Sequence, residues 1–187
     1  MYYNCVNERS AEKQRRLEQS FLELLQTKLY DDISVSELCE KSGVSRKTFY
    51  RLFDSKADVL YALVDHTLMD FESFVTPPDV KEGEFHRFLA YLRCQKPLLD
   101  ALIKNNISTL LTERSLRLIL TENKENLQLF GIKEDDYTRE MMLFYFSGMF
   151  SLFLDWHISG FARPIDEMCD ILNNLMSRCP LEMFQPK

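Results

Sequence analysis

The sequence contains few residues that interrupt helices. Only five Gly and six Pro occur in 187 residues, a composition that fits long helices joined by short loops. No segment alternates apolar and polar residues for long enough to predict a β-sheet. Apolar residues instead recur at helical spacing along most of the chain. The sequence therefore predicts an all-α protein, long enough for one or two domains with a proper core.

Long hydrophobic runs are also missing. The most apolar stretch, residues 141–154 (MMLFYFSGMFSLFL), has fourteen residues, fewer than the roughly 18 needed to span a bilayer. The first ten residues, MYYNCVNERS, lack the apolar core of a signal peptide. We therefore expect a cytoplasmic protein without a membrane partner.

Residue patterns that support catalysis or metal binding are absent from the sequence. Its three histidines, His66, His86 and His157, are dispersed, and no H-E-x-x-H, G-x-S-x-G or glycine-rich phosphate loop occurs. The five cysteines are odd in number and lack metal or redox spacing, which favours reduced thiols. We expect no catalytic residue, no metal site and no cofactor. Two alternatives stay open: redox sensing by Cys94 or Cys169, and a catalytic role for His157 in place of a core position.

Residues 33–56, ISVSELCEKSGVSRKTFYRLFDSK, form the most informative segment that is present. Ser34 and Glu37 make an S-x-x-E capping box, which predicts the start of a helix. Gly43 tolerates a positive φ and can end that helix. Ser45 is a good N-cap for the next helix. The segment therefore predicts a helix, a tight turn and a second helix, the arrangement that places a helix in the DNA major groove.

The second helix of this segment, about residues 45–53, is predicted to have two faces. Phe49, Leu52 and Phe53 follow helical spacing and should be buried. The polar side is expected to carry Arg46, Lys47, Tyr50 and Arg51, with Thr48 at its margin. Residues 41–56 hold five basic residues and one acid in a chain of net charge −6. Such side chains contact phosphates and base edges, so the helix is a candidate DNA reader, although a solvated charged face is the alternative.

The stretch GVSRKTFYRLFDSKADVL (residues 43–60) resembles the signature of the tetracycline-repressor (TetR/AcrR) family. It shares the Gly-Val-Ser turn, the Thr-aromatic-Tyr core and the Lys that starts the fourth helix. Upstream, YDDISVSELCEKSG is similar to the approach to the family's second helix, so the resemblance covers about residues 10–72. The dipeptide Lys47-Thr48 departs from the Gly-Thr or Pro-Thr of many members, which leaves the target sequence open.

The resemblance implies DNA contacts at specific positions. Ser34 and Ser36 would approach the DNA backbone, and Tyr50 and Lys56 would contact phosphates. The positions that touch bases and phosphates in the family are held here by Ser45, Arg46, Lys47 and Thr48. The pattern of the second helix adds Arg51 to this DNA-binding set.

The chain is expected to divide into three parts. A helix-turn-helix DNA-binding domain would cover residues 1–54, a connecting helix residues 55–75, and a helical effector-binding and dimerisation domain residues 76–187. The boundary is set by Thr-Pro-Pro-Asp at residues 76–79. Helices outside the motif are predicted at about residues 10–27, 81–94, 96–105, 107–128 and 134–159, and after Pro164 to about Ser177.

The predicted helix at 134–159 is apolar nearly all round, so it should be buried on more than one side. One side can face the chain's own core, and the other then needs a second chain. The resemblance implies that the last two helices pair with their symmetry mates, with Gly148 allowing close approach. Candidate interface residues are Ser147, Ser151, Leu154, Trp156, Ile158, Met168, Ile171 and Leu175. A monomer with a central helix is the alternative.

The resemblance also implies a small-molecule cavity between the body helices. The candidate pocket residues are Phe85, Leu89, Leu92, Leu118, Met142, Tyr145, Phe146 and Met149, all of which could instead be ordinary core. The implied function is that of a homodimeric repressor released from a palindromic double-stranded DNA operator by an unknown apolar or amphipathic effector. The alternative is a regulator, activator or repressor, controlled by a protein partner.

Overall fold

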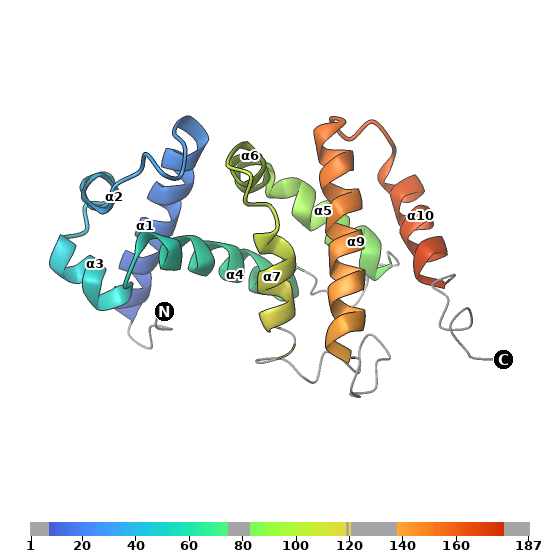
Figure 1. Ribbon diagram of the computed structural model, residues 1–187, viewed down its shortest axis with the longest axis horizontal. Helices are drawn as coiled ribbons and strands as arrows, with labels where there is room; N and C mark the ends of the chain where they lie inside the picture. Colours follow the sequence, from blue (N-terminus) through green and yellow to red (C-terminus); the bar gives the residue numbers. More distant parts are fainter. Residues whose placement is uncertain (1–7, 75–82, 119, 121–137, 178–187) are drawn as a thin grey trace.

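The computed structural model describes residues 8–74, 83–118, 120 and 138–177, and within these ranges the regular structure is helical (Figure 1). The all-α prediction is confirmed. The helices are α1 (Glu8–Thr27), α2 (Val35–Ser42), α3 (Arg46–Leu52), α4 (Lys56–Phe74), α5 (Glu84–Cys94), α6 (Lys96–Lys104), α7 (Leu110–Arg117), α9 (Thr138–Ile158) and α10 (Ile165–Ser177). The helix predicted at 107–128 is found as α7, and its second half lies outside the described residues.

The helices gather at the two ends of an elongated molecule (Figure 1). We call α1–α3 the head and α5–α10 the body. α4 runs from the head into the body, where it packs on α5 and α7. One apolar core extends through both parts, from Leu17 in α1 to Leu172 in α10. The head is therefore packed onto the rest of the chain.

A buried ion pair ties α4 to the body. Arg114 of α7 donates from Nε to Asp65 Oδ1 of α4 at 2.5 Å and from its terminal nitrogen to Asp65 Oδ2. The two side chains are 5% and 1% exposed. The Arg114 guanidinium also lies 5.0 Å from the ring centroid of Tyr61. A bidentate pair of this kind fixes both the separation and the angle of its two helices.

The apolar helix α9 is longer than the apolar run in the sequence. Among the described helices, Arg139–Ile158 is long and apolar enough to cross a bilayer, with a mean hydropathy of 1.2. The core helix of a globular protein satisfies the same criterion. Here α9 packs on α7, with Phe150 and Phe153 almost completely buried. The composition of α9 is therefore not evidence that this helix spans a membrane.

The turn between α9 and α10 is held by aromatic side chains. Gly160 and Phe161 both adopt the left-handed conformation, with φ of 71° and 59°. The Phe161 ring packs edge-on against Trp156, with centroids 4.9 Å apart, and Trp156 Nε1 donates to the carbonyl of Arg163. Trp156 is therefore 2% exposed, in the core of its own chain. Met168 of α10 is likewise 4% exposed, so neither side chain is available to a second chain.

The predicted pocket residues lie in or beside the apolar core of the body. Leu89, Leu92, Leu118, Met142 and Phe146 are buried, whereas Phe85, Tyr145 and Met149 are half-buried. The ring of Phe146 stacks on that of Phe150. Two hollows occur elsewhere, one between α1 and α6 and one along α1, and none of the eight residues lines them. The small-molecule pocket thus stays a prediction.

Candidate nucleic-acid interface

Local signals in the sequence shape the turn that presents α3. Ser34 is the N-cap of α2, and its side chain accepts a hydrogen bond from the Glu37 backbone N–H at 3.1 Å. The Glu37 carboxylate pairs with Lys28. Of the two hydrogen bonds in the predicted capping box, the structure therefore shows the one that the Ser34 side chain accepts. Gly43 ends α2 in the left-handed region at φ 65°, where a side chain would be strained. Val44 then fills the corner and is 4% exposed.

α3 begins at a second serine cap and shows the two predicted faces. The Ser45 hydroxyl oxygen accepts from the Thr48 backbone N–H at 3.2 Å. Phe49, Leu52 and Phe53 are almost completely buried. Their burial anchors the helix, so the remaining side chains point away from the core.

Most of the predicted DNA-contacting residues in and around α2 and α3 are accessible. Thr48 is half-buried, and the exposed members are Ser34, Ser36, Ser45, Arg46, Lys47, Tyr50 and Arg51. Tyr50 is 52% exposed while its ring rests edge-on against Phe49, 5.2 Å between centroids. The structure thus leaves most of these residues accessible, and their contacts with DNA remain predictions.

The cations of α3 differ from those nearby in how they are paired. Lys41 lies 2.9 Å from Glu23 of α1, and its hydrogen bond lowers the pKa of that carboxyl. Within the described part of the chain, by contrast, no hydrogen bond or ion pair engages Arg46, Lys47 or Arg51. These three charges are therefore available to phosphates and base edges.

Lys56 has a role that sequence reasoning missed. Its Nζ donates to the backbone carbonyls of Tyr30, Asp31 and Ile33 at 2.7, 3.2 and 2.8 Å, and lies 4.5 Å from the Tyr30 ring centroid. An ammonium has three donors, so all of them serve the loop between α1 and α2. The phosphate contact implied by resemblance would have to replace one of these bonds. Local sequence patterns could not predict these hydrogen bonds, because they join residues more than twenty positions apart.

The start of α4 is set by a complete capping box. The Asp58 carboxylate accepts from the Ser55 backbone N–H at 3.0 Å, and the Ser55 hydroxyl oxygen accepts from the Asp58 backbone N–H at 3.3 Å. These two reciprocal bonds satisfy backbone donors that the first turn of a helix leaves unpaired. They also fix Lys56 directly after the cap, in reach of the loop.

The comparisons with known proteins agree with this arrangement. The family model described as bacterial regulatory proteins, tetR family, matches residues 22–63. The HTH-type transcriptional regulator EthR of Mycolicibacterium smegmatis is 50% identical over 42 residues, which are 22% of this chain and 19% of that protein. The chain thus matches about a fifth of the length of that curated relative.

Two solved structures are similar over most of the chain. A tetR-family transcriptional regulator from Streptomyces coelicolor has a TM-score of 0.57 at 19% identity, covering 90% of this chain and 80% of that one. The dihydroxyacetone kinase operon activator DhaS has a TM-score of 0.55 at 16% identity, covering 93% and 98%. At these identities the likeness concerns the fold alone.

Together, the fold and the exposed α3 define a helix-turn-helix protein with a helical body. Residues 22–63 match the model of the tetR family of bacterial regulatory proteins, which confirms the resemblance seen in the sequence of the helix-turn-helix.

Proposed function

We propose that this chain is a DNA-binding transcriptional regulator that lays α3 in the major groove. The observation that carries this proposal is the unpaired cationic side of α3. Arg46, Lys47 and Arg51 are exposed and bonded to no described partner, while the opposite side of the helix is locked into the core. Guanidinium and ammonium groups held in this way match guanine edges and phosphates.

The remaining head residues would set the register of α3 on the duplex. Ser34 and Ser36 lie at the start of α2 and would donate to phosphates, as would Tyr50. Ser45 and Thr48 share a hydroxyl hydrogen bond of 3.0 Å, which presents both at the start of α3. Lys56 joins this set only if it releases a loop carbonyl.

We further propose that two chains pair through α9 and α10. An exposed stripe on α9 follows the spacing i, i+4, i+7, i+11, i+14: Phe144, Gly148, Ser151, Asp155 and Ile158. We call it the α9 stripe. Its end residues Phe144 and Ile158 are 68% and 67% exposed, so the stripe offers a second chain apolar contacts at both ends. Small residues at its centre allow two helix backbones to approach closely.

The other predicted interface residues differ in how exposed they are. Leu175 of α10 is 50% exposed, while Ser147, Leu154 and Ile171 are half-buried. Trp156 and Met168 belong to the chain's own core and leave the proposed interface. A two-fold dimer would place two α3 helices at half-sites about 34 Å apart on one face of a near-palindromic operator.

The family resemblance suggests a repressor released by a small molecule. A ligand that binds only one arrangement of the body would change the separation of the two heads and so lower DNA affinity. The candidate ligand contacts remain the eight core and half-buried residues named above. A cytoplasmic location follows from this function.

Control by a protein partner is the second candidate. It is favoured by the exposure of Leu143, 40%, beside Phe144 on α9, because adjacent apolar side chains can serve as a docking surface. The fold neighbour named as an operon activator keeps the sign of regulation open.

Selection of bound fragments from the source genome tests the proposal. Purified full chain is mixed with sheared genomic DNA at physiological salt, and bound fragments are sequenced. Recovery of a few near-palindromic sites supports a dimeric regulator, and neighbouring genes then indicate the effector class. Salt-sensitive binding without sequence preference would contradict sequence recognition by α3.

A further inference from the structure

The body contacts the head at a second place besides α4. The C-terminal end of α6 lies against the end of α1, where Lys104 Nζ donates to the Gln26 carbonyl at 2.9 Å. One residue further on, the Asn105 side-chain oxygen accepts from the backbone N–H of Tyr30 at 2.6 Å. The Asn105 amide nitrogen donates to the Ala101 carbonyl at 2.8 Å. The two bonds together fix the orientation of this amide.

Tyr30 lies in the short loop between α1 and α2, residues 28–34. Its N–H is held by Asn105 of the body and its carbonyl by Lys56 of α4. The loop ends at Ser34, the N-cap of α2. Because α2 and α3 are joined by the tight turn at Gly43, the position of the loop sets the position of α3.

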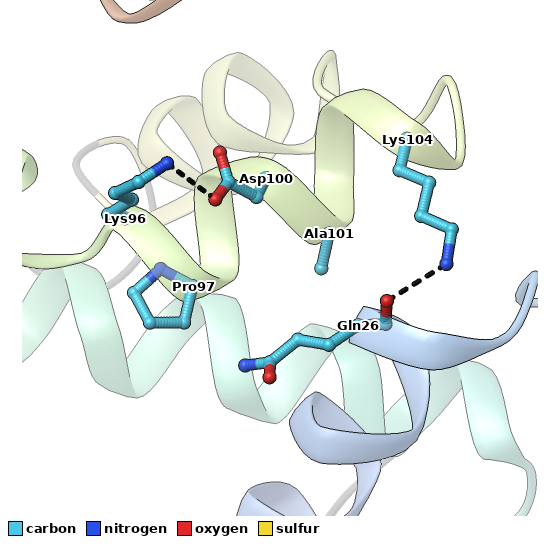
Figure 2. A pocket seen from close by; sticks show the side chains of 6 residues that line it. All are labelled: Gln26, Lys96, Pro97, Asp100, Ala101 and Lys104. Atoms are coloured by element: carbon cyan, nitrogen blue, oxygen red, sulfur yellow. Dashed lines mark hydrogen bonds and ion pairs between the residues drawn. The ribbon is translucent and has the colours of Figure 1, made fainter. Parts of the chain in front are cut away.

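Side-chain packing between α1 and α6 is incomplete next to this contact. A hollow of about 360 Å³ separates Gln26 from Lys96, Pro97 and Asp100 of α6 (Figure 2). Figure 2 shows the Lys104 side chain reaching from α6 to the Gln26 backbone at the far side of this hollow. The hydrogen bonds at the C-terminal end of α6 therefore help to fix the position of α6 relative to α1.

The same helix is attached to α9. The Asp100 carboxylate lies 2.7 Å from Nε2 of His157, near the end of α9, and the His157 side chain is 4% exposed. Asp100 also pairs with Lys96 at 2.7 Å. Hydrogen bonds from Lys96 and His157 keep the pKa of Asp100 below its usual value. α6 thus connects the end of the α9 stripe to the loop that leads into the helix-turn-helix.

We propose that Asn105 is a positioning residue for DNA recognition. It acts by holding the Tyr30 N–H, which fixes the orientation of α2 and α3 relative to α6 and α9 without touching DNA. The proposal rests on the proposed DNA-binding function. In a dimer it lets the body set the spacing of the two recognition helices through α6 as well as through α4.

The test compares two substitutions in the full chain. Asn105→Leu removes the acceptor at similar size, whereas Asn105→Asp keeps an oxygen for the Tyr30 N–H. The control is Asn174→Ala on α10, which removes the corresponding bond from a side-chain amide to a carbonyl four residues back. Each variant is titrated with one genome-selected duplex and with a pool of random-sequence duplex. Amide exchange at Tyr30 and thermal unfolding are measured in parallel.

Asn105→Leu is expected to bind the selected duplex about tenfold more weakly, the loss that follows from about one hydrogen bond. Binding to the random pool should be unchanged, since the phosphate-facing cations remain. Tyr30 amide exchange should accelerate, and Asn105→Asp and Asn174→Ala should resemble the wild type. Equal weakening on both duplexes, or loss of affinity only in step with thermal stability, would mean a purely structural role and would overturn the proposal.

The failures of the two proposals are distinguishable. If the wild type selects a duplex and Asn105→Leu binds it equally well, positioning by Asn105 is wrong and the proposed function stands. If the wild type shows no sequence preference, the proposed function fails and the positioning proposal fails with it. A Tyr30 amide that stays protected in Asn105→Leu would show that this hydrogen bond does not hold the loop.

Discussion

The head and the body of this chain carry different charge. Residues 1–56, which end at the start of α4, hold ten Lys or Arg and nine Asp or Glu, whereas residues 57–187, which comprise the rest of α4 and the body, hold thirteen and twenty. DNA phosphates repel the acidic body, whereas the head is near neutrality and has five of its ten cations in residues 41–56. Under the proposed function, this difference would orient the molecule with α3 toward the duplex and the body away from it. A near-neutral head would then bind DNA through the segregation of its charges.

The two parts also differ in what they leave exposed. The head buries its large apolar side chains and presents polar ones, apart from Leu29 and the ring of Tyr50. The body exposes Phe144, Ile158 and Leu175. The proposed interfaces with DNA and with a second chain would thus be separated along the chain. The predictions below test that separation.

Breaking the ion pair between α4 and α7 should have the largest effect. Asp65→Asn leaves the Arg114 guanidinium buried beside a neutral group, which should lower the free energy of unfolding by about 3–5 kcal/mol. Urea unfolding measures the loss. Asp70→Asn, at an exposed position on the same helix, is the control. If Asp65→Asn lowers the free energy of unfolding as little as Asp70→Asn does, the buried ion pair does not hold α4 to the body.

Removing cations from α3 should affect DNA binding and leave folding intact. The double variant Arg46→Ala, Lys47→Ala should weaken operator binding by about 1–3 kcal/mol for each base contact and relax the sequence preference. Fluorescence anisotropy with a genome-selected duplex measures this effect. Arg139→Ala on α9 removes an exposed cation of the body and should have little effect. If Arg139→Ala lowered the affinity for the duplex as much as the double variant does, DNA binding would not be specific to the head.

Lys56 tests whether a head cation serves the fold or the DNA. Lys56→Met removes three hydrogen bonds to loop carbonyls and should lower the free energy of unfolding by about 1–3 kcal/mol. If Lys56 also neutralises a phosphate, the slope of log affinity against log salt should become shallower by about 0.9 for each head. Unfolding and salt titrations separate the two roles. If Lys56→Met kept both its free energy of unfolding and its salt slope, neither role of Lys56 would hold.

Gly148 tests the body surface alone. A Cβ added there meets no atom within 4 Å, so Gly148→Ala should stabilise the isolated chain by about 1 kcal/mol through helix propensity. Gly148→Glu should weaken the proposed dimer by introducing charge into the α9 stripe. Sedimentation equilibrium measures the association. Arg139→Glu, near the start of α9, controls for added negative charge, and an unaltered dimer in Gly148→Glu would remove the stripe from the interface.

The sequence predicted those features that depend on neighbouring residues. Ser34, Gly43 and Ser45 act within one helical turn, so their caps could be read directly from the chain. The buried side of α3 followed from spacing alone. Because these short-range features make up the helix-turn-helix, most of the candidate DNA-binding surface was predictable.

Contacts between distant residues were not predictable in this way. The bonds of Asn105 to Tyr30, His157 to Asp100 and Arg114 to Asp65 join residues 75, 57 and 49 positions apart. Trp156 illustrates the same limit, since periodicity cannot tell which side of an apolar helix faces its own core. The Phe161 ring and the Arg163 carbonyl, which decide the matter, come from the following turn.

A pH-dependent contact between α1 and α4 gives the smallest predicted effect. His66 Nδ1 of α4 lies 2.9 Å from the Glu18 carboxylate of α1, which is 5% exposed. The hydrogen bond to Glu18 raises the pKa of His66 above its ordinary 6.5, with smaller contributions from Asp70 and Asp65, while burial opposes the shift. Because the folded chain binds this proton more tightly than the unfolded chain, the contact stabilises fully below the ordinary pKa. The stabilisation is lost as pH rises through the raised pKa.

Urea unfolding of the wild type and of His66→Gln across this pH range isolates the contribution. Glutamine can donate to Glu18 at every pH but carries no titrating charge, so effects of other groups cancel in the difference between the two proteins. That difference should be largest below pH 6.5 and decline above it. A difference that stays constant or grows with pH would show that the Glu18 contact does not favour protonated His66. The hydrogen bond to Glu18 would then stabilise neutral His66 as well as the protonated form.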